Sequence, residues 1–433
     1  MKKVIYLMIC AASIFCACTR VNSNEPSVNP QDTTKVTPPD TSSTTVGTMR
    51  QPKPMSFASA EEQLAYRTNE FTFNLTSLVC ANPDKPNIIL SPLSASLMLG
   101  MVMNGADGET LAQMQQALGF EGLSKAEINA WYKSLLDRLP ALDSETTVKI
   151  ANSIWVHETF PVKQDFIADN QQYFYATTDN VDMTKAKTAD RINQWAADNT
   201  NDLIKEVVDA QAIHDCVMIL ANALYFKSRW SSPFDPEFTH KSDFTPLNGS
   251  RIKPDMMSGE MYARYAEIPE GQLLEMDYRG GSYCMDVLLP TKGADIRQVV
   301  GSLTADAWNA MLKPLAYNNV WIRFPRLKAR YNRKLTDDLK AAGIKRALSP
   351  AAEFPFVSDV PTYLSWVKQF CYLSVDEDGT EAAAVTIGGY ETTSAEPEPV
   401  IEFFVDRPYF LVIREKQQGN ILFTAMITNP EAE

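Results

Sequence analysis

The sequence predicts an α+β fold, in which helices occupy the first half of the domain and strands dominate the second. Apolar residues recur at helical spacing up to Leu118 and again after Ala189, whereas long uninterrupted apolar runs begin at Val217. No linker is visible between residues 60 and 430. We therefore expect one large domain in which a helical layer covers the sheets.

The helices are recognised by their spacing and by the residues at their ends. Acidic residues precede the first, Ser91-Pro92 supplies a cap and a first-turn proline for the second, and Gly119 ends the third. The predicted helices are one with Leu64, Phe71, Leu75 and Leu78, one from Ser91 through Met103, one from Glu109 to Leu118, and one after Ala189 with Ile192, Trp195 and Leu203.

The strands are apolar runs that turn residues separate. Val217 to Phe226 is long and uninterrupted, which is typical of a strand that is buried on both faces. Gly419-Asn420 marks a turn between the last two strands. The other predicted strands are Asn87 to Leu90, Met285 to Pro290, Val320 to Phe324, Tyr409 to Ile413 and Ile421 to Thr428.

Composition excludes some partners. The chain has 433 residues, of which 45% are hydrophobic, enough for a large core. Its 53 acidic and 40 basic residues give a net charge of −13. Nucleic acids and anionic membrane surfaces attract clusters of Lys and Arg, and this sequence has none of that density. We expect no nucleic-acid partner.

The N-terminus has the pattern of an export signal. Lys2 and Lys3 precede the apolar run Val4 to Phe15, which is too short to span a bilayer. A small residue before Cys18 resembles a bacterial lipobox, which implies that Cys18 is lipidated and begins the mature chain; the alternative is ordinary signal-peptide cleavage. We therefore predict a lipoprotein signal peptide (residues 1–18) and an exported protein held at a membrane by its lipid, in the periplasm or at the cell surface.

The next segment predicts a tether. Residues 19–54 contain six prolines, many Ser and Thr and almost no large apolar side chains, so they cannot bury enough surface to fold. We expect this segment to be a disordered Ser/Thr/Pro-rich linker between the anchor and a folded domain at residues 55–433.

The cysteines and histidines give no sign of a metal or a catalytic triad. Seven cysteines are present, three of them in the leader. The other four form no CxxC pair, and their apolar contexts favour free buried thiols over two disulfides. None of the three histidines lies in a Gly-x-Ser-x-Gly or His-Glu-x-x-His motif. We expect no metal, no cofactor and no enzymatic activity. The leader cysteines are Cys10, Cys16 and Cys18, the other four cysteines are Cys80, Cys216, Cys284 and Cys371, and the histidines are His157, His214 and His240.

Several blocks occur in a characteristic order along the chain. They are Asn87 to Ser94, Gly105 to Thr110, Asn222 to Trp230 with Pro233-Phe234, Phe324 to Leu327, Leu339 to Ile344, Asp406 to Phe410 and Asn429-Pro430. In this order the blocks resemble the serpin family over roughly residues 60 to 430. The resemblance implies helices packed on a large mixed β-sheet, two smaller sheets and an exposed reactive-centre loop at about residues 377–403. It also implies shutter residues Ser91, Ser94 and Asn222 and a breach residue, Trp230.

Two positions depart from the family pattern. Gln369 stands where the family usually has a histidine that bonds to the shutter asparagine. An amide both donates and accepts, so Gln369 is able to form a hydrogen bond to Asn222, but without the pH sensitivity of a histidine. Ala425 replaces a common glycine, which we interpret as a packing adjustment.

The hinge before the loop has the residues that insertion into a sheet requires. One face of the segment alternates small residues, and proline, which lacks the ladder donor, appears only at Pro397 and Pro399. Bulky or charged hinge residues, which accompany non-inhibitory serpins, do not occur on that face. The hinge is Glu377, Gly379, Thr380, Glu381, Ala382, Ala383 and Ala384, and the small face is Thr380, Ala382, Ala384, Thr386 and Gly388.

The resemblance implies suicide inhibition, in which a protease acylated by the loop is trapped when the cut loop inserts. Counting from Glu377 places the scissile bond at Thr393-Ser394, with Thr392, Ser394 and Tyr390 as alternative positions. No Lys or Arg lies between Glu377 and Arg407, which disfavours trypsin-like targets.

We predict a monomer that forms a 1:1 covalent complex with an elastase-like serine protease. A chymotrypsin-like or papain-like enzyme is the alternative target. Two other functions stay open: a non-inhibitory serpin that acts as a surface carrier or adhesin, and a hydrolase or glycan-handling lipoprotein.

Overall fold

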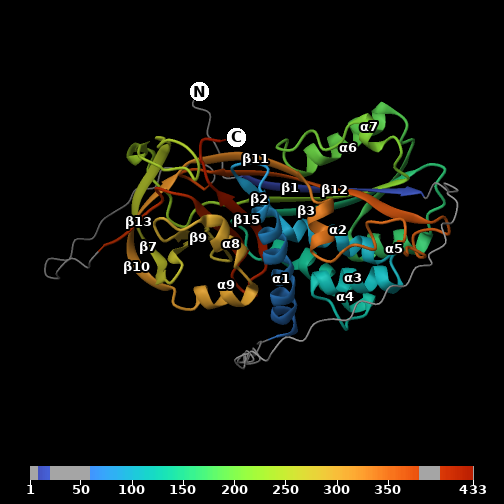
Figure 1. The fold of residues 1–433 in the computed structure, drawn as a ribbon, viewed down its shortest axis with the longest axis horizontal. Coiled ribbons are helices and arrows are strands. Elements are labelled where there is room, and N and C mark those ends of the chain that lie inside the picture. The colour runs from blue at the N-terminus through green and yellow to red at the C-terminus, as the bar shows by residue number, and fades with distance from the viewer. Residues whose placement is uncertain (1–7, 20–58, 380–399, 433) are drawn as a thin grey trace, which may run out of the picture.

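The computed structural model describes residues 8–19, 59–379 and 400–432. Two sheet systems with helices around them form the described part of the molecule (Figure 1). The strands of the six-stranded central sheet run along the long axis of the view, and the helices gather mainly below it (Figure 1).

The central sheet has six strands. These are β1 (Met8–Thr19), β3 (Thr147–His157), β4 (Thr177–Val181), β5 (Met218–Lys227), β11 (Leu327–Lys334) and β12 (Thr362–Val375). Their order is β11-β12-β1-β5-β3-β4. Only β3 and β4 pair in parallel, so the sheet is mixed. Nine of the ten residues of β5 are buried, because other elements cover both of its faces.

The remaining strands form one continuous path. They are β2 (Ile88–Leu90), β6 (His240–Lys241), β7 (Asp255–Ile268), β8 (Gly271–Asp277), β9 (Tyr283–Pro290), β10 (Ala316–Pro325), β13 (Ile401–Phe404), β14 (Tyr409–Glu415) and β15 (Ile421–Ile427). The order is β13-β10-β7-β8-β9-β14-β15-β2, with β6 paired to β7. The two smaller sheets expected from the resemblance are joined here, because β7 is long enough to pair with β10 and, through its second half, with β8.

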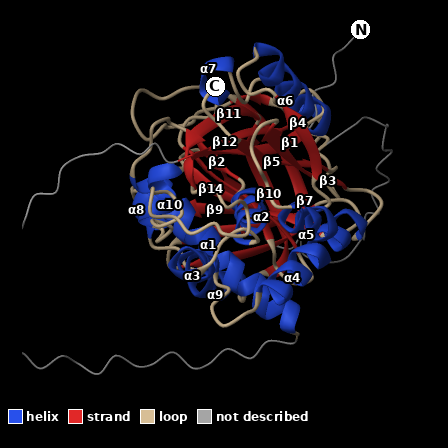
Figure 2. Ribbon diagram, turned by 90° about the vertical axis from the view of Figure 1, so that its right-hand side faces the viewer, coloured by secondary structure: helices blue, strands red, loops and turns tan. Residues whose placement is uncertain are grey.

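Helices cover both faces of the central sheet. Figures 1 and 2 show α1 to α5 on one face and α6 and α7 across the other. The helices are α1 (Ala60–Ala81), α2 (Pro92–Met103), α3 (Gly108–Leu118), α4 (Lys125–Arg138), α5 (Gln164–Phe174), α6 (Ala186–Asn199), α7 (Ala210–Ile213), α8 (Ile296–Gly301), α9 (Ala305–Leu312) and α10 (Thr336–Ala341). Two 3-10 turns, η1 (Leu139–Ala141) and η2 (Pro236–Phe238), complete the set.

The helix starts follow local chemistry. The Ser59 and Ser91 side chains accept hydrogen bonds from the first turns of α1 and α2, and Pro92 occupies the first position of α2. Ser124 and Glu127 form a reciprocal capping box at α4. Every residue of α2 is buried, which places this helix at the centre of the domain, against β5, β1 and β15.

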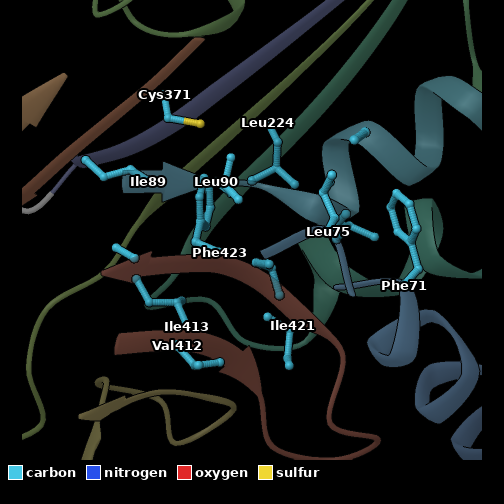
Figure 3. Close-up of a cluster of buried hydrophobic side chains, with 14 of the residues drawn as sticks. Phe71, Leu75, Ile89, Leu90, Leu224, Cys371, Val412, Ile413, Ile421 and Phe423 are labelled. Atoms are coloured by element: carbon cyan, nitrogen blue, oxygen red, sulfur yellow. The ribbon is translucent and has the colours of Figure 1, made fainter. Parts of the chain in front are cut away.

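The main core lies between the two sheet systems. Figure 3 shows where β2, β5 and β12 meet β14, β15 and α1, with Leu90, Leu224 and Phe423 at the middle of the cluster. A second, smaller core lies between the central sheet and α6, and it includes Ile14, Ile192 and Ile219. A strand of the central sheet therefore has one face in each core.

The predicted elements are confirmed, with one difference at a boundary. Leu203 lies beyond α6, which ends at Asn199. The Thr200 hydroxyl donates to the carbonyl of Ala196 and accepts from the amide of Ile204. Asn201 and Asp202 have positive φ angles, so the chain leaves the helical path there. The apolar spacing that predicted a longer helix continues to Leu203, but Asn201 and Asp202 interrupt the helical backbone before it.

The leader contains an unexpected element. Residues 8–18, predicted as part of a signal peptide, and Thr19, predicted as the start of the tether, form β1 within the central sheet, and Cys16 is disulfide-bonded to Cys216. The interpretation of Cys216 as a free thiol is therefore wrong, because its partner lies outside the four domain cysteines among which a pair was sought. Cys80, Cys284 and Cys371 are free and buried, as expected.

Candidate functional site

The centre of the site is a strand position between β5 and β12. Both strands pair with β1 antiparallel, so β5 and β12 run parallel to each other on its two sides. The pairing with β12 extends from Ile9 opposite Leu373 to Thr19 opposite Thr362. We call this position the strand seat. A chain that leaves the end of β12 and turns back would enter the seat in the direction that β1 takes.

The two faces of the sheet at the strand seat have different surroundings. Ser13 is fully buried against the Ser94 hydroxyl of α2, at 3.0 Å. Ile14 and Cys16 point into the smaller core under α6. Because side chains alternate along a strand, an occupant has to fit closed space on both faces around Ser13 to Ala17, and neither face has room for an unpaired charge there.

A buried polar network lies below the middle of the strand seat. The Ser94 hydroxyl donates to Asn222 Oδ1 at 2.5 Å, and Asn222 Nδ2 donates to Asn152 Oδ1 at 2.8 Å. Asn152 in turn donates to the carbonyl of Phe174 at 2.7 Å. The Ser91 hydroxyl donates to the carbonyl of Leu422 at 2.9 Å. The network ties α2 to β5, β3 and β15, so movement of these strands has to break or exchange its bonds.

Gln369 joins this network differently from the sequence-based expectation. Its Nε2 donates to the Ser91 carbonyl at 2.8 Å and to Ser13 Oγ at 3.0 Å, and its Oε1 accepts from the Ser91 amide at 3.1 Å. The bond to Asn222 is indirect, through Ser13 and Ser94. The direct Gln369–Asn222 bond that the sequence allows is replaced by this indirect route, because the occupant of the strand seat places its own hydroxyl between the two amides.

At the end of β12, Trp230 fixes the chain that leads to the loop. It is 2% exposed and stacks on Tyr278 with ring centroids 4.7 Å apart. Its Nε1 donates to the Asp376 carbonyl at 2.9 Å, and its amide donates to the Asp378 carbonyl at 3.2 Å. The predicted breach residue thus forms hydrogen bonds with the start of the hinge.

Glu377 is the anchored residue of the hinge. Its carboxylate is buried and accepts from Arg326 Nε at 2.7 and 2.9 Å, and it pairs with Arg326 Nη2 at 2.6 Å. The Thr239 hydroxyl also donates to it. A charged, bidentate pair of this kind is strong and directional. Sequence reasoning assigned no role to Arg326, although the position lies in one of the family blocks.

Gly379 is the last described residue of the hinge, and its place requires glycine. Its φ is +67°, and a Cβ there would lie 2.3 Å from the Trp230 nitrogen. Both the backbone conformation and the close approach exclude a side chain. The chain therefore turns sharply over Trp230 directly after the anchored Glu377.

Asp376 carries a buried carboxylate that is poorly hydrogen-bonded. It is 5% exposed, and neither of its carboxylate oxygens has a hydrogen-bond partner of good geometry within the described part of the chain. Burial, and then the charges of Glu377 and Asp378, raise its pKa to about 7, although the Asp378 amide and Arg326 act in the opposite sense. A carboxyl group in this environment favours its neutral form, so the hinge contains a group that is costly to ionise.

The loop itself lies outside the described residues. Thr380, Glu381, Ala382, Ala383, Ala384, Tyr390, Thr392, Thr393 and Ser394 all belong to that segment, so their assigned roles stay predictions. The described residues Glu377 and Gly379 lie beside Trp230, whereas Ser91, Ser94, Asn222 and Gln369 lie at the strand seat. Cys18 lies in β1, and its lipidation stays a prediction.

A buried charged cluster elsewhere has the residue types of a metal site. Ligand atoms of Glu275, Cys284 and Asp286 lie within 4.8 Å of one another. The two carboxylates are already paired: Arg414 contacts Asp286 at 2.6 Å and Glu275 at 2.5 Å, and Lys416 contacts Glu275 at 2.9 Å. A divalent cation would face two fixed cations, so the cluster is built for an ion-pair network.

Within residues 8–19, 59–379 and 400–432, none of the helices combines the length and the apolar character that crossing a bilayer requires.

Comparisons with known proteins agree with this arrangement. The family model described as Serpin (serine protease inhibitor) matches residues 66–430. Human neuroserpin is 31% identical over 378 residues, which cover 84% of this chain and 90% of that protein. An uncharacterized serpin-like protein of Methanosarcina acetivorans is 29% identical over 385 residues, with 86% and 89% covered.

Solved structures show the same similarity. The crystal structure of tengpin, a thermophilic serpin in the native state, superposes with a TM-score of 0.75 at 27% identity, and the match covers 87% of this chain and 97% of tengpin. Mouse protein-Z dependent protease inhibitor also gives 0.75, at 26% identity, with 86% and 98% covered.

Proposed function

Because the chain belongs to the serpin family of serine protease inhibitors, we propose that it traps a protease covalently by inserting its cut loop into the strand seat. The protease serine attacks the carbonyl carbon of Thr393, the peptide bond to Ser394 breaks, and the new amine leaves with the proton. The loop then remains bound to the serine as an ester. Insertion before water hydrolyses that ester produces the trapped 1:1 complex.

The observation that carries the proposal is the continuity between β12, the anchored hinge and the strand seat. β12 forms one wall of the seat and ends at Val375. The hinge turns at Gly379 beside Trp230, only four residues after the end of β12. A strand that runs back antiparallel to β12 would have the same orientation that β1 has in the seat.

The composition of the hinge suits the closed walls of the strand seat. The small face predicted from the sequence provides Thr and Ala for the side where Ser13 now packs. Thr386 provides a hydroxyl, which is able to replace the Ser13 contact to Gln369. Glu381 belongs to the opposite face near the start of the segment, where we expect its charge to stay in contact with water.

The leader strand and the loop compete for one position under this proposal. β1 occupies the strand seat, so a chain that retains residues 8–17 there has no space for the loop. We propose that removal of the leader before Cys18 vacates the seat and produces the inhibitory form. In this proposal the leader first directs export and is then removed, and the mature protein is held at a membrane through lipid on Cys18, as the sequence predicts.

The target class follows from the loop sequence. Because Lys and Arg are absent between Glu377 and Arg407, trypsin-like enzymes have no suitable residue to bind in their acidic pocket. Thr392, Thr393 and Ser394 suit the shallow pocket of elastase-like enzymes. Tyr390 suits a chymotrypsin-like or papain-like pocket. We propose an elastase-like serine protease as the principal target and no catalytic turnover by the chain itself.

The test is a protease panel. The protein, expressed from its full sequence so that its own processing is retained, is incubated with elastase, chymotrypsin, trypsin and papain and run on denaturing gels. We expect a covalent complex with elastase and a released C-terminal peptide that begins at Ser394. Trapping of trypsin but not elastase would refute the target class. If no enzyme is trapped and loop cleavage gives no gain in thermal stability, the insertion mechanism is wrong.

A further inference from the structure

The sequence contains two Asn-Gly pairs, Asn104-Gly105 and Asn248-Gly249, and the fold places them in opposite surroundings. Asparagine is a chemically labile residue, because the backbone nitrogen of the next residue is able to attack its side-chain amide. Glycine, which has no Cβ, hinders that attack least. A folded chain permits the reaction only where both the asparagine amide and the glycine N–H are free.

At the first pair, both reacting groups are held. Asn104 is buried, its Nδ2 donates to Asn170 Oδ1 at 3.2 Å, and its Oδ1 accepts from Asn129 Nδ2 at 2.9 Å. The Gly105 amide donates to the Val102 carbonyl at 3.0 Å. The pair lies at the C-terminal end of α2 inside the packed domain, so an attack there would first have to break buried hydrogen bonds.

At the second pair, both reacting groups are free. Asn248, Gly249 and Ser250 are all exposed. Within the described residues, neither the Asn248 side chain nor the Gly249 amide has a hydrogen-bond partner. A Cβ placed on Gly249 would meet nothing within 4 Å. The neighbouring atoms therefore leave room for the backbone rotation that the attack requires.

The path of the loop explains why Asn248 is free. Phe244 and Ile252 form an isolated antiparallel bridge, with amide-to-carbonyl distances of 3.0 and 2.9 Å. The Leu247 amide donates to the Thr428 carbonyl at 3.3 Å. The loop is thus held up to Leu247 and again at Ile252, and Asn248 lies in the turn between these two points. Exposed loop tips of this kind tolerate changes to the backbone.

We infer that Asn248 is a site of spontaneous modification, at which the folded protein deamidates to aspartate and isoaspartate while Asn104 is preserved. The Gly249 nitrogen loses its proton to hydroxide and attacks Asn248 Cγ, so that a C–N bond forms and the side-chain nitrogen leaves as ammonia. Water then opens the cyclic imide at either carbonyl. One opening gives aspartate, and the other directs the backbone through the side chain and gives isoaspartate. The inference is independent of the proposed inhibitory function.

The modification changes the charge of a surface groove. Asn248 lines an open groove of about 250 Å³, whose charged lining residues are Asp84, Lys85 and Arg297. Asp84 and Arg297 have ionic partners outside the groove lining, whereas Lys85 has no ion pair within the described residues. A carboxylate at position 248 turns a lining with one more cation than anions into a balanced one, so ageing removes the groove's excess positive charge.

The experiment ages the full-length protein at pH 8.5 and measures both sites by mass spectrometry of tryptic peptides. Lys241 and Arg251 bound a short peptide around Asn248, and Asn104 lies in a different peptide. In the native protein we expect Asn104 to convert about tenfold or more slowly than Asn248, because its buried hydrogen bonds have to open first. Protein held in urea is the control, in which both pairs should convert at similar rates. Equal rates in the native protein would refute the inference, as would an unchanged native Asn248 beside a converted urea sample.

Isoelectric focusing of variants provides the second readout. Wild type should develop a more acidic band as it ages, and Asn248→Gln should not, because the longer side chain closes the ring far less readily. Asn248→Asp has the aged charge from the start and should focus with the aged band. Thermal midpoints of both variants verify that they fold. If Asn248→Gln gains the acidic band at the wild-type rate, another side chain is the site and the inference is wrong.

Discussion

Replacement of Asp376 by asparagine tests whether the hinge contains a carboxyl group that resists ionisation. The pKa of Asp376 is raised from 3.8 to about 7 by burial and by the charges of Glu377 and Asp378, with Arg326 acting in the opposite sense. A folded-state pKa above the unfolded value means that the folded protein binds the proton more tightly. Its free energy of unfolding therefore falls as pH rises from about 4 to about 7, and is constant above that range.

The magnitude follows from the pKa difference. A shift from 3.8 to about 7 corresponds to about 4 kcal/mol lost above pH 7, of which about 1 to 2 kcal/mol is already lost at pH 5. An asparagine side chain in this place does not titrate, and the cost of burying its amide is the same at both pH values. The stability of Asp376→Asn relative to wild type should therefore rise by about 3 kcal/mol between pH 5 and pH 8.5.

Urea unfolding of both proteins at pH 5 and pH 8.5 measures this difference. Asp378→Asn is the matched control: it removes a neighbouring charge and leaves the buried carboxyl in place, so its pH-dependent effect should be in the same direction but smaller. The reasoning is refuted if Asp376→Asn differs from wild type by the same amount at both pH values, because the carboxyl would then titrate normally in the folded protein.

Two further predictions concern the strand seat and the hinge anchor. Removal of residues 1–17 should convert a chain that forms no covalent complex into one that does, because β1 no longer fills the seat; equal trapping by the two forms on denaturing gels would contradict the competition. Arg326→Met should lower the free energy of unfolding by about 1 to 3 kcal/mol, because the buried Glu377 carboxylate would keep only the Thr239 hydroxyl as a described donor, whereas Arg326→Met with Glu377→Gln should recover much of the loss in urea unfolding.

Elements whose signals are local could be predicted from the sequence. β5 is a continuous apolar run, and α2 has a capping Ser91 and Pro92 at its start. The family blocks then identified Trp230 and Ser94 as parts of the site. These positions carry their information within a few neighbouring residues, so one sequence is enough to find them.

Features that depend on distant residues were not predictable in the same way. The bond from Gln369 to Ser13 joins two strands whose pairing no local pattern specifies. The Cys16–Cys216 disulfide spans 200 residues, and the apolar leader carries a pattern that export signals and buried strands share. The unsatisfied Asp376 reads as one more acidic residue until its burial is known.

Under the proposed cleavage before Cys18, the Cys16–Cys216 disulfide would set an order for maturation. A cut before Cys18 separates residues 1–17 from the rest of the backbone, but Cys16 belongs to the removed piece and Cys216 to the retained one. If the thiols are oxidised first, the excised leader stays covalently attached and continues to fill the seat. Leader removal therefore has to precede oxidation, or a reductant has to follow it. A protein that is cut too late would have the correct new N-terminus and still carry the mass of its leader.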